Sequence, residues 1–282
     1  MSGALGVIAG GGDLPQRVAT AARRSGTPVV IAALEGFAED WTSDFDHVRA
    51  GLGELGKMID YFKAQGVSDV TFCGVVKRPD FSALKVDWRG ARALPQAIAA
   101  AAKGDDALLR VVVGVFESEG FAIAAPETFD DRLVAKEGRL GAVEPRAEHA
   151  QDIEKALDVA REIGRLDIGQ GAVVCDGVVL AVEAQEGTDL MLARVAELPQ
   201  AVRGAPTARR GVLAKLPKPI QERRIDLPTV GVATIAGVDK AGLAGVVVEA
   251  GGALIVDVDA VARAAEAAGV FVLVRSASVE SA

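Results

Sequence analysis

The sequence predicts an α/β protein with two domains: a doubly wound parallel sheet over residues 1–130 and an α+β domain with a mixed sheet over residues 135–275. At 282 residues the chain is long for a single core. The first half alternates continuous apolar runs with helical patterns, which is typical of a parallel sheet covered on both faces. Residues 126–146 combine prolines and glycines with weak periodicity, which indicates a boundary. A hairpin signal beyond that boundary indicates antiparallel strands.

The elements of the first domain follow from local periodicity. Apolar runs predict strands, and apolar residues at helical spacing predict helices. Gly26 and Gly66 are suited to end two of these helices, because glycine readily adopts the left-handed conformation found there. We expect strands at 5–9, 28–34, 70–76 and 121–125, and helices at 14–25, 54–65 and 105–119.

The second domain is predicted in the same way. Asp176-Gly177 suits a two-residue type I′ turn, in which both central residues have positive φ. Thr188 is an expected N-cap. We expect helices at 147–166, 187–198 and 241–250, hairpin strands at 172–175 and 178–184, and a strand, a helix and a strand between 254 and 274.

Charge and composition narrow the class of protein. A formal charge of -8 argues against a general nucleic-acid binder, which needs an electropositive face. The two cysteines and two histidines are too far apart in sequence for a Cys/His zinc site or a disulfide framework, although oxygen ligation of Mg²⁺ stays open. Neither a signal peptide nor a run of roughly 18–20 apolar residues is evident. We therefore expect a soluble cytoplasmic protein that would meet any lipid substrate at a membrane surface.

A glycine-rich turn follows the first expected strand. The stretch Gly10-Gly11-Gly12-Asp13-Leu14-Pro15 would bring backbone N–H groups and a helix N-terminus close to a phosphate or a sugar. The dinucleotide fingerprint Gly-x-Gly-x-x-Gly fails at Pro15, which argues against NAD. We expect nucleotide contact here; a tight strand-to-helix turn is the structural alternative.

Two charged clusters follow later strands. Lys77 and Arg78 come at the carboxyl end of the third expected strand, where open α/β sheets bind ligands, but they are equally consistent with a solvated pair. Asp105 and Asp106 suit the first turn of a helix without any function. In the second domain, Glu183 and its neighbour Glu186 are acids that end an apolar strand, and they are candidates to bind metal or sugar hydroxyls.

Residues 203–226 are strongly basic. Seven Lys and Arg side chains accompany a single acid, Glu222, between Arg203 and Arg224. Prolines at 217, 219 and 228 favour extended backbone. Lys215, Lys218 and Arg224 are candidates to grip a diphosphate. Asp226 beside them is a candidate to ligate Mg²⁺ or orient water, with an internal salt bridge as the structural alternative.

Five motifs in order resemble the LpxI-type UDP-2,3-diacylglucosamine diphosphatases over nearly the whole chain. They are Ile8–Pro15, Gly74–Pro79, Glu183–Asp189, Lys215–Pro219 and Arg224–Pro228. One departure is Glu222, where many relatives are expected to carry Asp.

The resemblance implies a function and its site. The expected reaction is hydrolysis of UDP-2,3-diacylglucosamine to UMP and 2,3-diacylglucosamine 1-phosphate (lipid X) in lipid A synthesis, with Mg²⁺ or a similar ion such as Mn²⁺. A Rossmann-like domain would bind the nucleotide, and the second domain would hold the acylated sugar. Asp226 is the expected catalytic residue and metal ligand. The expected substrate-binding residues are Gly10, Gly11, Gly12, Leu14, Lys77, Arg78, Gly187, Thr188, Asp189, Lys215, Lys218, Gln221 and Arg224.

Partners and rival functions complete the expectations. The expected partners are this substrate, lipid X and, transiently, the inner-membrane surface; a homodimer is compatible with the sequence. Small residues between 241 and 248 are candidates to line an acyl cavity, with close helix packing as the alternative. The main rival is a non-catalytic nucleotide-sugar binding protein. Two others are an NAD-dependent oxidoreductase and an adaptor that binds anionic membrane surfaces through the basic stretch.

Overall fold

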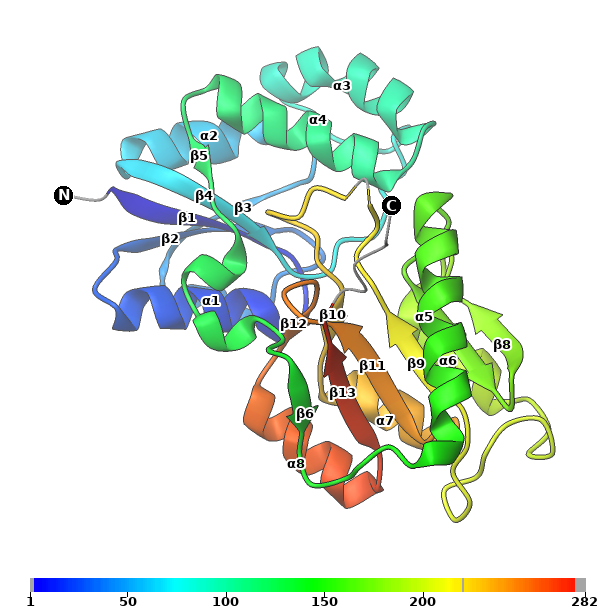
Figure 1. Ribbon diagram of the computed structural model, residues 1–282. Coiled ribbons are helices and arrows are strands. Elements are labelled where there is room, and N and C mark those ends of the chain that lie inside the picture. Colours follow the sequence, from blue (N-terminus) through cyan, green and yellow to red (C-terminus); the bar gives the residue numbers. More distant parts are fainter. Residues whose placement is uncertain (1–2, 220, 277–282) are drawn as a thin grey trace. The chain divides into compact units, whose positions relative to one another are not determined.

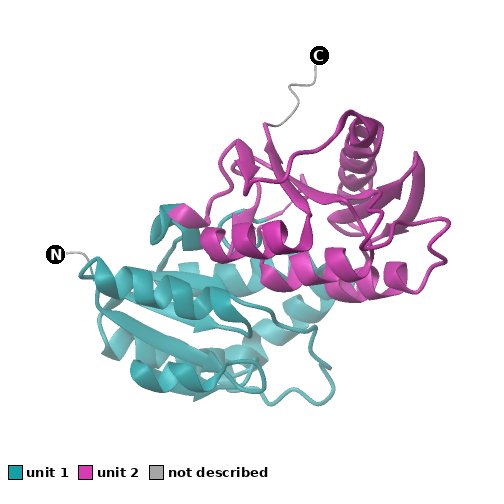
Figure 2. Ribbon diagram, turned by 90° about the horizontal axis from the view of Figure 1, so that it is seen from below, with its two compact units in different colours: residues 1–131, 222–226 teal, residues 132–221, 227–282 magenta. Residues whose placement is uncertain are grey.

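The computed structural model describes residues 3–219 and 221–276, which fall into two units (Figure 2). Unit 1 contains the described residues up to Asp131 together with Glu222–Asp226. Unit 2 contains Arg132–Gln221 and the described residues from Leu227 onward. The short segment that returns to unit 1 from far along the chain carries Asp226.

Unit 1 is built on a parallel sheet of five strands in the order β3-β2-β1-β4-β5. Figure 1 shows α1 on one face of this sheet and α2, α3 and α4 on the other. The strand order changes direction between β1 and β4, and both strands are parallel. Their carboxyl ends therefore flank the point where the winding reverses. The strands are β1 (Ala4–Ala9), β2 (Val29–Leu34), β3 (Asp46–Ala50), β4 (Val67–Cys73) and β5 (Ala122–Ile123); the helices are α1 (Asp13–Arg24), α2 (Leu55–Ala64), α3 (Trp88–Ala101) and α4 (Asp105–Ser118).

The prediction of an α/β first domain with a parallel sheet is confirmed, but β3 and α3 were not predicted. β3 lacks a continuous apolar run, because its sequence Asp-His-Val-Arg-Ala is that of a partly exposed edge strand. α3 contains Pro95 in its interior, a residue that normally argues against a helix. Asp87 supports its start by accepting a hydrogen bond from the Gly90 N–H at 2.8 Å.

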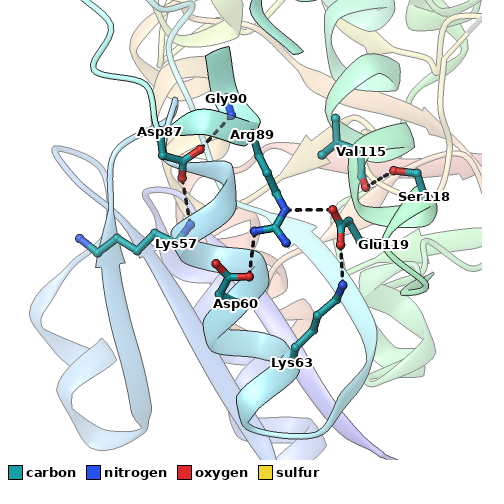
Figure 3. Close-up of polar contacts among 9 residues, drawn as sticks. All are labelled: Lys57, Asp60, Lys63, Asp87, Arg89, Gly90, Val115, Ser118 and Glu119. Carbon is teal, nitrogen blue, oxygen red and sulfur yellow. Dashed lines mark hydrogen bonds and ion pairs between the residues drawn. The ribbon is translucent and has the colours of Figure 1, made fainter. Parts of the chain in front are cut away.

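An ion-pair network ties three helices of unit 1 together (Figure 3). The guanidinium of Arg89, whose side chain is 15% exposed, lies 2.8 Å from Asp60 of α2 and 2.9 Å from Glu119, which follows α4. Lys63 adds a second cation at 2.5 Å from Glu119. Hydrogen bonds from these cations lower the pKa of the Glu119 carboxyl. The network therefore links α2, α3 and the residue that follows α4 within unit 1.

Unit 2 is built on a mixed sheet in the order β6-β13-β11-β9-β7-β8. β11 pairs in parallel with β13 and β9, whereas β6, β7 and β8 are antiparallel to their neighbours. A separate parallel pair joins β10 and β12. The strands are β6 (Gly138–Leu140), β7 (Gly171–Cys175), β8 (Val178–Val182), β9 (Val212–Lys215), β10 (Thr229–Val230), β11 (Gly245–Glu249), β12 (Leu254–Ile255) and β13 (Phe271–Arg275); the helices are α5 (Ala150–Arg165), α6 (Gly187–Ala196), α7 (Val232–Lys240) and α8 (Val258–Ala268).

The mixed sheet and its hairpin are confirmed. Asp176 and Gly177 have φ of 50° and 74°, as a type I′ turn requires. Asp152 of α5 stabilises the turn, because its carboxylate accepts the N–H groups of Asp176 at 3.0 Å and Gly177 at 2.7 Å.

The expected helix at 241–250 is wrong. The helix lies earlier, at α7, and Val246, Val247 and Val248 form the fully buried strand β11. A run of β-branched residues suits a strand buried on both faces, and here it outweighs the small residues around it. These side chains fill the core, so they do not line a cavity from a helix.

One buried histidine in unit 2 has a constrained ring. His149 is 6% exposed, its Nδ1 accepts the Arg146 N–H at 3.0 Å, and its ring lies 5.3 Å from that of Phe271. Burial, and then the charge of Arg146, lower the pKa of this imidazole. The neutral ring is therefore the form that the fold stabilises.

Among the described residues, no helix is long and apolar enough to cross a membrane.

Candidate functional site

The glycine turn of unit 1 packs against a second glycine turn. Gly11 and Val75 exchange two backbone hydrogen bonds, at 3.0 and 2.9 Å, just past the ends of β1 and β4. A Cβ on Gly10 would lie 2.8 Å from the Val75 carbonyl oxygen, and one on Gly74 would lie 2.7 Å from that of Gly11. These glycines therefore have a packing role, whatever they bind.

Gly12 differs from its two neighbours. Its φ of 83° and ψ of 177° form a conformation almost restricted to glycine, and a Cβ there would have no neighbour within 4 Å. It is the N-cap of α1, where no side-chain cap satisfies the first-turn N–H groups. Its own N–H donates to Glu39 Oε1 at 3.3 Å. Gly12 and the adjacent half-buried Leu14 thus present an open helix N-terminus that suits an anion.

Lys77 and Arg78 differ in how they are held. The Arg78 guanidinium donates to the Ala101 carbonyl at 2.6 Å and lies 3.3 Å from Asp105. Both partners belong to the junction of α3 and α4, so Arg78 anchors the loop after β4. Lys77 is exposed.

A turn formed by Glu222–Asp226 carries the expected catalytic acid in unit 1. The N–H groups of Ile225 and Asp226 donate to the Glu222 carbonyl at 3.0 and 3.1 Å. Asp106, which is 2% exposed on α4, accepts the Glu222 N–H at 2.8 Å. The buried carboxylate therefore ties this turn to a rigid helix.

The guanidinium of Arg224 is held within the same turn. Its Nε and Nη2 donate to the two carboxylate oxygens of Glu222 at 2.8 and 2.9 Å, and its Nη1 donates to Glu117 at 2.8 Å. These bonds lower the pKa of Glu222 and raise that of Arg224. The acid of uncertain role at 222 is thus the partner of Arg224, and Asp226 is a half-buried carboxylate at the end of the turn.

Unit 2 brings three other predicted residues into one polar cluster. Lys215 ends β9 and is 4% exposed, and its ammonium donates to the Thr229 carbonyl at 2.8 Å. Glu183, just past β8, is 6% exposed and accepts the Thr188 hydroxyl at 3.1 Å. Burial raises the pKa of Glu183, and the charge of Lys215 opposes that rise.

The helix start near this cluster corrects one prediction. Thr188 is not the N-cap of α6, because the helix begins at Gly187 with Glu186 before it. The hydroxyl turns to Glu183 instead of capping the backbone. Gly187 has a φ of 76°, and Asp189 is exposed on the first turn.

Glu186 is separated in role from Glu183. Its carboxylate lies 2.7 Å from the guanidinium of Arg194 on α6, and backbone hydrogen bonds, together with this contact, lower the pKa of Glu186. Only Glu183 of the two acids therefore joins the buried cluster.

Lys218 and Gln221 lie in the segment that follows β9. The Lys218 ammonium lies 2.8 Å from Asp167, and its backbone N–H donates to the Gln221 amide oxygen at 2.9 Å. Gln221 also reaches Gln170 at 3.3 Å. An anion that binds Lys218 would compete with Asp167.

A geometric cluster of metal-binding types lies elsewhere in unit 2. Atoms of Asp152, Cys175 and Asp176 approach within 4.8 Å of one another. Asp152 already caps the hairpin turn, and burial raises the pKa of the Cys175 thiol to about 11. The hairpin explains this group without a metal.

Sequence reasoning missed one residue of the site. Asp106 was explained by the helix first turn alone, yet its carboxylate holds the turn that carries Asp226. No local signal marks this role, because the two partners are 116 residues apart in the chain.

Comparison with known proteins agrees with the two units. The LpxI N-terminal domain matches residues 4–133, and the LpxI C-terminal domain matches residues 136–273. A relative from Caulobacter vibrioides, UDP-2,3-diacylglucosamine pyrophosphatase LpxI, is 56% identical over 269 residues, which cover 95% of this chain and 96% of that protein. By both its domain matches and this identity, the chain belongs to the LpxI family.

Proposed function

We propose that this protein hydrolyses the diphosphate bond of UDP-2,3-diacylglucosamine to UMP and 2,3-diacylglucosamine 1-phosphate (lipid X), a step of lipid A synthesis. The identity to a relative named as the pyrophosphatase for this substrate, over nearly the full length of both chains, carries the proposal.

Unit 1 supports a role in nucleotide binding, and we propose residues 1–130 as a Rossmann-like nucleotide-binding domain. Its strand order places two neighbouring carboxyl ends at the reversal of winding, where ligands of open α/β sheets bind. The open α1 N-terminus at Gly12 offers backbone N–H groups to a phosphate. We assign Gly10, Gly11 and Leu14 to shaping this turn, and Lys77 to an exposed cation near it.

Unit 2 supports a role in holding the acylated sugar, and we propose residues 135–275 for that domain. Its buried cluster combines an ammonium, a carboxylate and a hydroxyl, which suits a ligand with phosphate and sugar groups. Lys218 and Gln221 extend this polar surface, and Gly187 and Asp189 flank it. Buried CH₂ groups of the acyl chains would add about 0.8 kcal/mol each to affinity.

We propose Asp226 as the catalytic residue, a water-orienting acid or a ligand of Mg²⁺ or Mn²⁺. The donor chemistry fits such an ion, because Mg²⁺ is commonly held by one or two carboxylates together with substrate phosphates and water. Glu222 is unsuited to be the second ligand, since Arg224 binds both of its oxygens. A bound cation would neutralise charge that develops on the phosphates. The hydrogen bonds of the turn hold the backbone of Asp226.

Three further parts of the proposal concern context. We propose that the protein acts in the cytoplasm, touches the inner-membrane surface to reach its lipid substrate, and can form a homodimer. Vesicle co-sedimentation and light scattering measure the second and third of these.

The test is a turnover assay on purified protein. UDP-2,3-diacylglucosamine in mixed micelles is incubated with Mg²⁺, and UMP release is followed by chromatography. We expect release of UMP and lipid X in equal amounts, and its loss with EDTA. Tight binding without release would instead support a non-catalytic nucleotide-sugar binding protein.

A further inference from the structure

A glycine separates an acid from a base in the sheet of unit 2. Gly171 on β7 pairs with Lys215 on β9, and its carbonyl accepts the Glu183 N–H at 2.7 Å on the other side. Residues opposite one another in antiparallel strands point to the same face. Glu183 and Lys215 therefore share a face, about 10 Å apart at the backbone, with no side chain between them.

The glycine is required by the acid that covers it. A Cβ on Gly171 would lie 2.4 Å from Glu183 Oε2, and one on Gly169 would lie 2.0 Å from the Glu183 carbonyl oxygen. Gly171 thus leaves space for the buried carboxyl group, which is costly to bury, whereas Gly169 leaves space for the backbone of Glu183.

The carboxyl group is only half satisfied within the fold. Oε1 accepts the Thr188 hydroxyl, whereas Oε2 is buried and has no hydrogen-bond partner in residues 3–219 and 221–276. Buried acids held against this cost are concentrated at functional sites. Glu183 shares a face of the sheet with Lys215, a cation of the proposed sugar-phosphate site, so its burial is consistent with a role in that site.

We propose that Glu183 is a positioning residue of the sugar site, and that it turns Thr188 into a hydrogen-bond acceptor for the ligand. This inference rests on the proposed function. A hydroxyl has one proton, and that of Thr188 is donated to Glu183, so only oxygen lone pairs remain for the ligand. A phosphate oxygen cannot donate to them. The ligand group that meets Thr188 is therefore a sugar hydroxyl or an acyl-amide N–H, while Lys215 serves the phosphate.

Variants of the full chain test this on UDP-2,3-diacylglucosamine turnover. Glu183→Leu removes the acceptor, and Glu183→Gln keeps an oxygen in its place. We expect Glu183→Leu to raise KM about tenfold, the effect of one lost hydrogen bond to a charged group, with kcat nearly unchanged because the sugar donor is not a reacting group. Glu183→Gln should restore most of the lost affinity. Thermal unfolding checks that each variant folds.

A second substitution tests whether the acid acts through the hydroxyl. Thr188→Val should raise KM by a similar factor, and the double variant Glu183→Leu/Thr188→Val should be no worse than either single one. Glu197→Leu, at the exposed far end of α6, is the matched control and should leave both constants unchanged.

The outcomes separate this inference from the proposed function. Turnover by wild type with an unchanged KM in Glu183→Leu overturns the positioning role alone. Losses that multiply in the double variant, or that appear in kcat with KM unchanged, overturn the assignment of Thr188 as an acceptor for the sugar. If wild type neither turns over nor binds the substrate, the proposed function fails and this inference fails with it.

Discussion

Replacing Gly12 by alanine separates backbone strain from ligand binding at the glycine turn. With φ of 83° and ψ of 177°, an alanine there would be strained by about 1–3 kcal/mol, offset by about 0.4–1 kcal/mol from the reduced freedom of the unfolded chain. No atom lies within 4 Å of the new methyl group, so no clash adds to this. We expect a net loss of about 1–2 kcal/mol in stability and about tenfold weaker binding of UMP, since the methyl group enters the space proposed for the phosphate.

Gly26 provides a matched control at the other end of α1. It has the same φ of 83° and equally open surroundings, so Gly26→Ala should also lose stability. Its affinity for UMP should not change. Urea unfolding measures the first quantity and isothermal titration the second. Equal effects of the two variants on UMP affinity, or no effect of either, would refute nucleotide binding at this turn.

Three further predictions concern other parts of the chain. Asp106→Ala should speed amide exchange at residues 225 and 226 roughly 10- to 100-fold, because it removes a hydrogen bond from a buried carboxylate worth about 1.5–3 kcal/mol. Arg89→Leu should lower the urea concentration at the midpoint of unfolding, since two carboxylates lose their shared partner. His149→Phe should flatten the dependence of stability on pH below about 6.5.

The last prediction follows from the sign of the pKa shift. The pKa of His149 is lower in the folded chain than its ordinary 6.5, so the unfolded chain binds more protons as pH falls. The contribution of His149 to stability is therefore fully present above about pH 6.5, and it is lost as pH falls through the pKa of the folded chain. Parallel pH curves for wild type and variant would contradict this.

Matched substitutions control the first two of the three. Asp13→Ala removes an exposed first-turn carboxylate of α1 in the same unit and should leave exchange at residues 225 and 226 unchanged. Arg92→Leu, exposed on α3, should change stability by less than about 0.5 kcal/mol. If Asp13→Ala sped exchange as much as Asp106→Ala, the hydrogen bond of Asp106 would not explain the effect. If Arg92→Leu lowered stability as much as Arg89→Leu, the ion pairs of Arg89 would not explain it.

Local patterns predicted the features that depend on neighbouring residues. The Asp176-Gly177 turn and the glycine turn after β1 both rest on backbone conformations that few residues adopt, so they are readable from sequence. The expected helix over β11 failed where composition and periodicity disagreed. Small residues around Gly245 favoured a helix, whereas the central position in the sheet decided for a strand.

Features that depend on distant partners could not be predicted. Asp106 and the Glu222–Asp226 turn meet only in the folded chain, and so do Arg224 and Glu117. Glu183 was recognised as an unexplained acid at a strand end, but the role of Gly171 in making room for it required the strand register. The basic segment 203–226, predicted to grip a diphosphate, thus contains cations such as Lys218 and Arg224 that form ion pairs with carboxylates of this chain.

Release of UMP by Asp226→Asn, compared with wild type, tests the central claim most directly. The variant keeps the size and neighbours of the side chain but loses the charge that would orient water or hold a cation. We predict that wild type converts UDP-2,3-diacylglucosamine to UMP and lipid X, and that Asp226→Asn binds this substrate with at least 100-fold slower release. Release by the variant at the rate of wild type would contradict the account.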